Sequence, residues 1–105
     1  MKQETINEIL AFTQDRDWEQ FHTPTNLAKS IVIEAAELLE CFQWSDEYSL
    51  EHVKEELADV FVYCIDLAQN LNLDIDEIIM EKMQKNKEKY PIDKAKGKST
   101  KYTKL

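Results

Sequence analysis

The scarcity of turn-forming residues is the feature that most constrains this chain, because its 105 residues include one glycine and two prolines. Glycine and proline are common in tight turns, so a fold of many short strands would need more of them. Hydrophobic residues make up 43% of the chain, which is ample for the packed interior of one domain. We therefore expect an all-α fold built from a few long helices.

The spacing of apolar residues indicates where those helices lie. Apolar side chains recur at intervals of three and four residues, as they do on one face of a helix. We expect helices at residues 3–15, 26–43, 50–71 and 75–89. Thr25 or Asn26 is the expected cap of the second helix, and Asp74 is the expected cap of the fourth. The second helix is apolar nearly all round, which is typical of a buried helix.

The segment RDWEQFHTPTN, residues 16–26, is unusually aromatic for a connection between helices. It contains Trp18, Phe21 and His22, and Pro24 interrupts its regularity. Two interpretations stay open, a loop folded over the core or a lid that stacks on a planar ligand. At the other end, residues 94–105 form a basic, polar tail that we expect to be flexible, after a domain of residues 1–93.

Two acidic pairs lie within apolar helical runs. Glu34 and Glu37 are three residues apart, as are Glu56 and Asp59, so each pair shares one helix face. The 18 positions between Glu37 and Glu56 allow a helical hairpin, which would point four carboxylates into one space. Hard divalent cations such as Mg²⁺ prefer oxygen ligands and would neutralise such a cluster. The alternative is a set of acidic residues along a solvated groove.

Charge and composition exclude several other classes. A net charge of −8 argues against a nucleic-acid-binding surface, which needs basic residues for the phosphates. No apolar run approaches the ~18 residues of a membrane span, and the polar N-terminus does not read as a signal peptide, so we expect a cytoplasmic protein. Cys41 and Cys64 lie in apolar helical stretches and are expected to be buried free thiols.

Four motifs in order give the sequence a family resemblance: RDWEQFH, EAAELLECFQW, EELADVFVY and EKMQKNKEKYP. Together they resemble the MazG-like all-α nucleoside triphosphate pyrophosphohydrolases, in particular the dCTP pyrophosphatase branch, from about residue 5 to residue 93. The resemblance implies a bundle of four to five helices assembled as a homo-oligomer, either a dimer or a tetramer. It also implies Mg²⁺-dependent hydrolysis of dCTP or a modified dCTP to the monophosphate and pyrophosphate, with Mn²⁺ as a possible substitute.

The resemblance further implies roles for individual residues. The metal ligands would be Glu34, Glu37, Glu56 and Asp59, and Glu34 or Glu37 would accept the proton of the attacking water. The residues expected at the base are Trp18 and Trp44, and His22 is expected to bind substrate from a segment near the base, without an individual role. Those expected at the sugar or triphosphate are Tyr63, Lys82 and Asn86, with Lys82 offsetting charge on the departing pyrophosphate.

Two alternatives to this function stay open from the sequence. One is an enzyme of the same fold that acts on dUTP or another non-canonical nucleotide. The other is a non-catalytic helical module for oligomerisation or regulation, whose acidic residues are merely solvated.

Overall fold

A computed structural model describes residues 1–105 and contains helices but no strand, so the predicted all-α class is confirmed. The chain divides into two units, Met1–Leu73 and Asp74–Leu105, and each is described by itself. The first unit contains α1 (Gln3–Asp15), the 3-10 turn η1 (Glu19–Phe21), α2 (Pro24–Glu40) and α3 (Leu50–Asn70). The second contains α4 (Ile75–Lys89), α5 (Ile92–Ala95) and the 3-10 turn η2 (Tyr102–Lys104).

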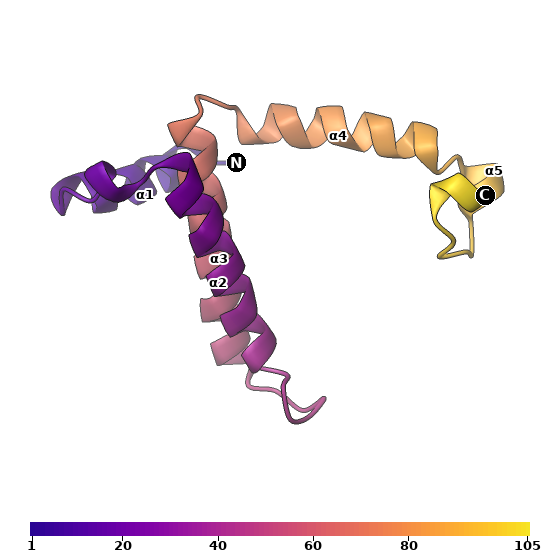
Figure 1. Cartoon of the computed structure of the whole chain (residues 1–105), viewed down its shortest axis with the longest axis horizontal. Helices are drawn as coiled ribbons and strands as arrows, with labels where there is room; N and C mark the ends of the chain where they lie inside the picture. The colour runs from indigo at the N-terminus through magenta and orange to yellow at the C-terminus, as the bar shows by residue number, and fades with distance from the viewer. The chain divides into compact units, whose positions relative to one another are not determined.

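The first unit is built on a helical hairpin. Helices α2 and α3 lie side by side, and α1 packs against α3 (Figure 1). The most buried apolar side chains are Ile6 of α1, Leu27 at the start of α2, and Ile65 and Ala68 in the last turns of α3. The core therefore lies where the three helices meet, and the rest of the hairpin extends away from it.

The start of α2 differs from the prediction. The structure places the cap at Thr23, whose hydroxyl accepts a hydrogen bond from the Asn26 amide at 3.2 Å, so the predicted cap at Thr25 or Asn26 is wrong. Pro24 occupies the first helical position, where its fixed φ suits a helix and its missing N–H is not needed. At the other end, α2 stops at Glu40, and residues 41–43 continue as a tighter turn.

The remaining helix bounds follow the prediction closely. Helices α1 and α4 have the predicted bounds, and α3 ends one residue earlier than predicted. Asp74 caps α4 as predicted, since its carboxylate accepts a hydrogen bond from the Glu77 amide at 3.0 Å.

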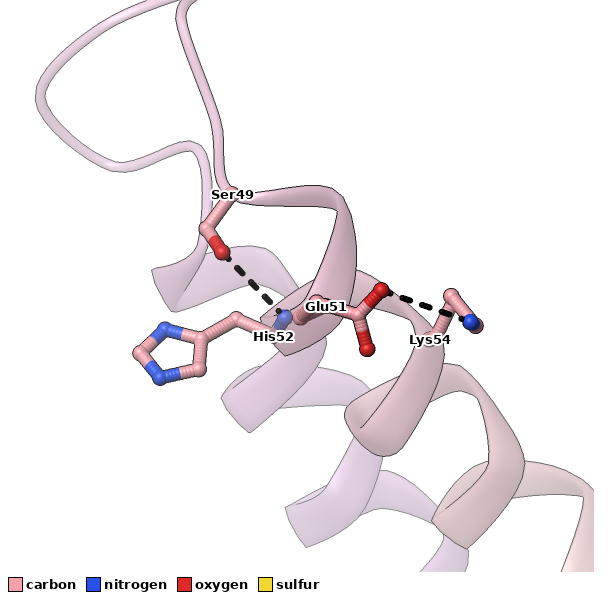
Figure 2. A network of polar contacts seen from close by, with 4 residues as sticks. All are labelled: Ser49, Glu51, His52 and Lys54. Atoms are coloured by element: carbon pink, nitrogen blue, oxygen red, sulfur yellow. Dashed lines mark hydrogen bonds and ion pairs between the residues drawn. The ribbon is translucent and has the colours of Figure 1, made fainter.

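The first turn of α3 carries polar contacts of its own (Figure 2). The Ser49 hydroxyl accepts from the His52 amide at 3.5 Å, and Lys54 Nζ lies 3.4 Å from Glu51 Oε1. Both side chains of the ion pair are largely exposed, so the pair adds little stability. The cap fixes where the loop after α2 turns into α3.

Helix α2 is less buried than its composition predicts. Leu27 is its one buried residue, whereas Val32, Ile33 and Leu39 are each more than half exposed. The prediction of a buried second helix is therefore wrong for the single chain, because α2 uses α3 as its main packing partner and leaves its other sides open.

An aromatic contact joins the end of α4 to the turn η2 in the second unit. The Tyr90 and Tyr102 rings meet edge to face at 5.9 Å, and Lys89 Nζ lies 4.8 Å from the centre of the Tyr102 ring. The region predicted as a flexible tail thus includes the end of α5 and the turn η2, with Gly97 at a φ of 76° between them. Its flexibility stays a prediction.

Two further features bear on the expected class of protein. Cys41 and Cys64 are both free and half-buried. None of the helices combines the length and the apolar character that crossing a membrane requires.

Candidate functional site

A cluster of carboxylates lies between α2 and α3. Glu34 of α2 and Glu56 and Asp59 of α3 each place one carboxylate oxygen within 4.8 Å of the others. Glu37 lies one turn along α2 from Glu34, and its negative charge acts on both Glu34 and Glu56. The hairpin therefore brings together all four acidic residues that the sequence singled out.

The electrostatics of this cluster are unfavourable without a counter-charge. Burial raises the pKa of Glu34 to about 7, and the hydrogen bond and negative charge of Glu37 add to the effect. Burial also raises the pKa of Glu56, with repulsion from Glu37 and Asp59 next in size. Oε2 of Glu34 and Oε2 of Glu56 are both buried without a hydrogen-bond partner. Two unsatisfied carboxylate oxygens amid like charges fit the ligand set of a hard divalent cation.

A cleft of about 500 Å³ opens beside the cluster. Glu34 and Asp59 form part of its lining, and aromatic side chains form much of the rest. The aromatic residues along it are Phe12, Trp18, His22 and Tyr63. A second hollow of about 320 Å³ shares Trp18, His22 and Tyr63 with the first. Acidic groups and aromatic rings thus line the same cleft.

The aromatic segment after α1 is fastened to its neighbours. The Trp18 ring lies edge to face with Phe12 of α1 at 5.5 Å. The His22 ring lies 6.5 Å from Tyr63 of α3, and Asn70 Nδ2 donates to the His22 carbonyl at 2.8 Å. The segment therefore folds onto the helices, as the first of the two interpretations expects, while Trp18 and His22 also line the cleft.

Tyr63 lies between the acidic and aromatic parts of the cleft. Burial raises the pKa of its hydroxyl, and the nearby charges of Glu34 and Asp66 raise it further. The hydroxyl is therefore protonated at neutral pH and available as a hydrogen-bond donor.

Comparison with known proteins shows the family of this chain. A model of the MazG-like family matches residues 29–105, which is most of the chain and includes the four acidic residues of α2 and α3. The chain belongs to the MazG-like family. The family resemblance seen in the motifs is therefore confirmed.

Individual relatives of this MazG-like chain are similar over most of its length. It is 36% identical to dCTP pyrophosphatase 1 of Mus musculus and 38% identical to that of Homo sapiens, each over 104 aligned residues and 90% of this chain. The chain spans 61% of the length of each of these mammalian proteins. A crystal structure of a pyrophosphatase from Archaeoglobus fulgidus DSM 4304 is 40% identical, with a TM-score of 0.76 over 84% of this chain and 90% of that one.

Three predicted residues of the MazG-like site lie elsewhere in the chain. Trp44 is in the loop between α2 and α3, is 88% exposed, and does not line the cleft. Lys82 and Asn86 lie on α4 in the second unit, where Asn86 Nδ2 is 3.9 Å from Met83 Sδ. The roles of these three residues stay predictions.

Two acidic residues and one aromatic residue along the cleft were not singled out from the sequence: Glu8, Asp66 and Phe12. Asp66 had a usable signal, because it lies seven residues after Asp59 and therefore on the same face of α3. It is also an acidic residue in an otherwise apolar run, as were the residues of the two acidic pairs. Glu8 and Phe12 had no such signal, since nothing in α1 shows that its side faces a ligand.

Proposed function

We propose that this MazG-like chain hydrolyses a nucleoside triphosphate, dCTP or a modified dCTP, to the monophosphate and pyrophosphate with Mg²⁺ as cofactor. The observation that carries the proposal is that Glu34 and Asp59 belong both to the carboxylate cluster and to the aromatic cleft. Phosphates bound at the cluster would have the nucleoside in the cleft. The names of the relatives, dCTP pyrophosphatase 1 and a pyrophosphatase, support the same reaction.

Glu34, Glu56 and Asp59 would hold the cation, with Glu37 beside them. Their two unsatisfied buried oxygens and their mutual repulsion suit Mg²⁺, and Mn²⁺ accepts the same oxygen ligands. The ion would supply the positive charge that lets a triphosphate approach an acidic site.

The protein's own residues would do the rest of the work. Glu37 is exposed and its charge acts on both Glu34 and Glu56, so we assign it the proton of the attacking water. Trp18 and His22 would hold the base ring, and the Tyr63 hydroxyl would donate a hydrogen bond to the sugar or phosphates.

The family resemblance adds three residues to this proposal. On that ground Lys82 would offset charge on the pyrophosphate, Asn86 would contact the triphosphate or sugar, and Trp44 would contact the base. Single alanine variants test these roles through KM for the triphosphate, and an unchanged KM and kcat would remove the residue from the site.

We also propose that the chain works as a homo-oligomer. Large apolar side chains of α2 and α3 are exposed in the single chain, including Val32, Ile33, Leu39 and Phe61. Exposed apolar surface of this extent marks an interaction site on a soluble protein.

Pyrophosphate release from a panel of canonical and modified nucleoside triphosphates, with Mg²⁺ and with EDTA, tests the reaction. Metal-dependent release concentrated on dCTP and its 5-substituted forms is the expected result. Release concentrated on dUTP or another nucleotide would keep the enzyme class and replace the substrate. No release from any triphosphate, by a folded protein that also shows no Mg²⁺-dependent thermal shift, would favour the non-catalytic module.

A further inference from the structure

Asp66 is a buried acidic residue of the cleft that the proposed hydrolysis does not use. Its exposed fraction is 6%, yet it lies along the same cleft as the aromatic side chains. Its carboxylate makes no hydrogen bond or ion pair with another side chain, although the charge of the nearby His22 acts on it. A buried carboxylate without a partner is costly, so a ligand that hydrogen-bonds to it would be recognised strongly.

Asp66 lies about two helical turns along α3 from Asp59 of the carboxylate cluster. Asp59, Tyr63 and Asp66 follow one another at intervals of four and three residues, so they share one face of the helix. Seven residues of helix correspond to about 10 Å along its axis. That span resembles the distance from the α-phosphate of an extended nucleotide to the far edge of a pyrimidine ring.

The surroundings of Asp66 suit a base. Trp18, His22 and Tyr63 line the same cleft and offer flat rings for stacking. The other polar residue buried beside the cleft, Thr13, already donates its hydroxyl to the Leu10 carbonyl at 2.9 Å. Asp66 is thus a buried polar residue of the cleft, outside the carboxylate cluster, that can accept a hydrogen bond from a ligand.

We propose that Asp66 selects cytosine over uracil by accepting a hydrogen bond from the exocyclic 4-amino group of the base. This inference rests on the proposed function, because it assumes that the phosphates lie at the carboxylate cluster. A carboxylate accepts N–H donors, and cytosine presents two of them at position 4. Uracil and thymine present a carbonyl oxygen at that position, which a carboxylate repels.

The charge state of Asp66 is consistent with this role. Burial raises the pKa of Asp66, and the nearby His22 lowers it. In both protonation states the side chain keeps an oxygen that accepts the amino group. The ionised form discriminates most sharply, because it has no proton to donate to the carbonyl oxygen of uracil.

The test is the Asp66→Asn variant, whose side chain has the same shape and can both donate and accept. Its amide can pair with the carbonyl of uracil as well as with the amino group of cytosine. We expect the ratio of kcat/KM for dCTP to that for dUTP to fall by roughly 10- to 100-fold, the range that follows from leaving a buried polar group without its partner. The wild-type protein is expected to prefer dCTP.

Glu8→Gln is the matched control, because Glu8 lines the same cleft with an exposed carboxylate. It removes one negative charge from the cleft, and we expect the dCTP to dUTP ratio to stay at the wild-type value. A fall in the ratio as large as that of Asp66→Asn would assign the effect to the charge of the cleft and overturn the proposal.

Calorimetric affinities for dCMP and dUMP in the presence of Mg²⁺ separate this inference from the proposed reaction. The wild-type protein could release no pyrophosphate and still prefer dCMP to dUMP. If that preference disappears in Asp66→Asn, the proposed reaction is refuted and the role of Asp66 is supported. An active enzyme whose dCTP to dUTP ratio is the same in Asp66→Asn would support the reaction and overturn the role. A wild-type protein without any cytosine preference, or without affinity for either nucleotide, would also overturn it.

Discussion

Glu34 combines three conditions that rarely meet in one carboxylate of a stable helix. It is partly buried, one of its oxygens lacks a partner, and three other acidic side chains surround it. Each condition disfavours its ionised form and raises its pKa. The ionised form of Glu34 is therefore unfavourable in the folded protein, and a bound cation would stabilise it.

The pH dependence of stability tests that penalty. The pKa of Glu34 is about 7 in the folded protein and 4.5 in its ordinary state. Between these values the folded protein binds a proton that the unfolded chain does not, so the free energy of unfolding rises as the pH falls from 8 toward 5. We expect Tm in EDTA to rise over this interval, and saturating Mg²⁺ to stabilise the protein most at pH 8.

Glu34→Gln is the control for that experiment. It removes the titrating group, and so the rise of Tm with falling pH in EDTA is expected to shrink. Identical Tm profiles in EDTA and in Mg²⁺ would contradict the assignment of the cluster as a cation site.

A separate prediction concerns the different roles of Glu37 and Glu56 in the carboxylate cluster. Glu37→Gln should lower kcat by about 10²- to 10⁴-fold, because it removes the group assigned to the proton of the attacking water. Mg²⁺ affinity, measured as the concentration dependence of Tm, should fall less in Glu37→Gln than in Glu56→Gln. If the two variants lose Mg²⁺ affinity equally, Glu37 is a metal ligand like Glu56 and does not act separately as the base.

At the scale of the element, the cap of α2 has a consequence for the cleft. Thr23 begins the helix directly after His22, so the cap also fixes where the aromatic segment ends. Thr23→Ala should lower the free energy of unfolding by about 1 kcal/mol, measured by urea denaturation. Thr25→Ala is the control, because Thr25 lies inside the first turn and caps nothing. Equal losses in the two variants would show that Thr23 does not act as the cap.

The helices also show how far the sequence could predict the fold. The bounds of α4 were predictable because Asp74 is a strong capping residue just before an amphipathic run. The start of α2 was missed because two threonines and an asparagine flank Pro24, and all three can cap. The local sequence ranks such candidates poorly, whereas the tolerance of proline at the first helical position decides between them.

The candidate site divides in a similar way. The four acidic residues could be predicted because the spacing within each pair and between the pairs is a local property of two helices. Glu8 and Phe12 could not, since their place in the cleft depends on how α1 packs against α3. Packing direction is a tertiary property, and an amphipathic pattern does not encode it alone.

At the scale of the whole molecule, the exposed apolar surface of α2 and α3 has to be covered in solution. We expect the wild-type chain to sediment as a dimer or tetramer at micromolar concentration, since its exposed apolar side chains favour association. Ile33→Lys should shift the equilibrium toward monomer by placing a charge in the contact. Glu40→Lys, on the same helix but already polar and exposed, is the control. A wild-type protein that sediments as a monomer would contradict the proposed assembly.

The hydrogen bond between Asn70 and His22 joins residues 48 positions apart, with the whole α2–α3 hairpin between them. Closing so long a loop carries an entropy cost, so we expect the contact to form after the α2–α3 hairpin has been ordered. The aromatic segment that contains Trp18 and His22 should therefore be the last part of the first unit to assemble. Stopped-flow fluorescence of Trp18 in a Trp44→Phe background would follow this step, and a signal that precedes helix formation would contradict it. A chain cut in the loop between α2 and α3 should lose the contact between Asn70 and His22 before it loses its helices.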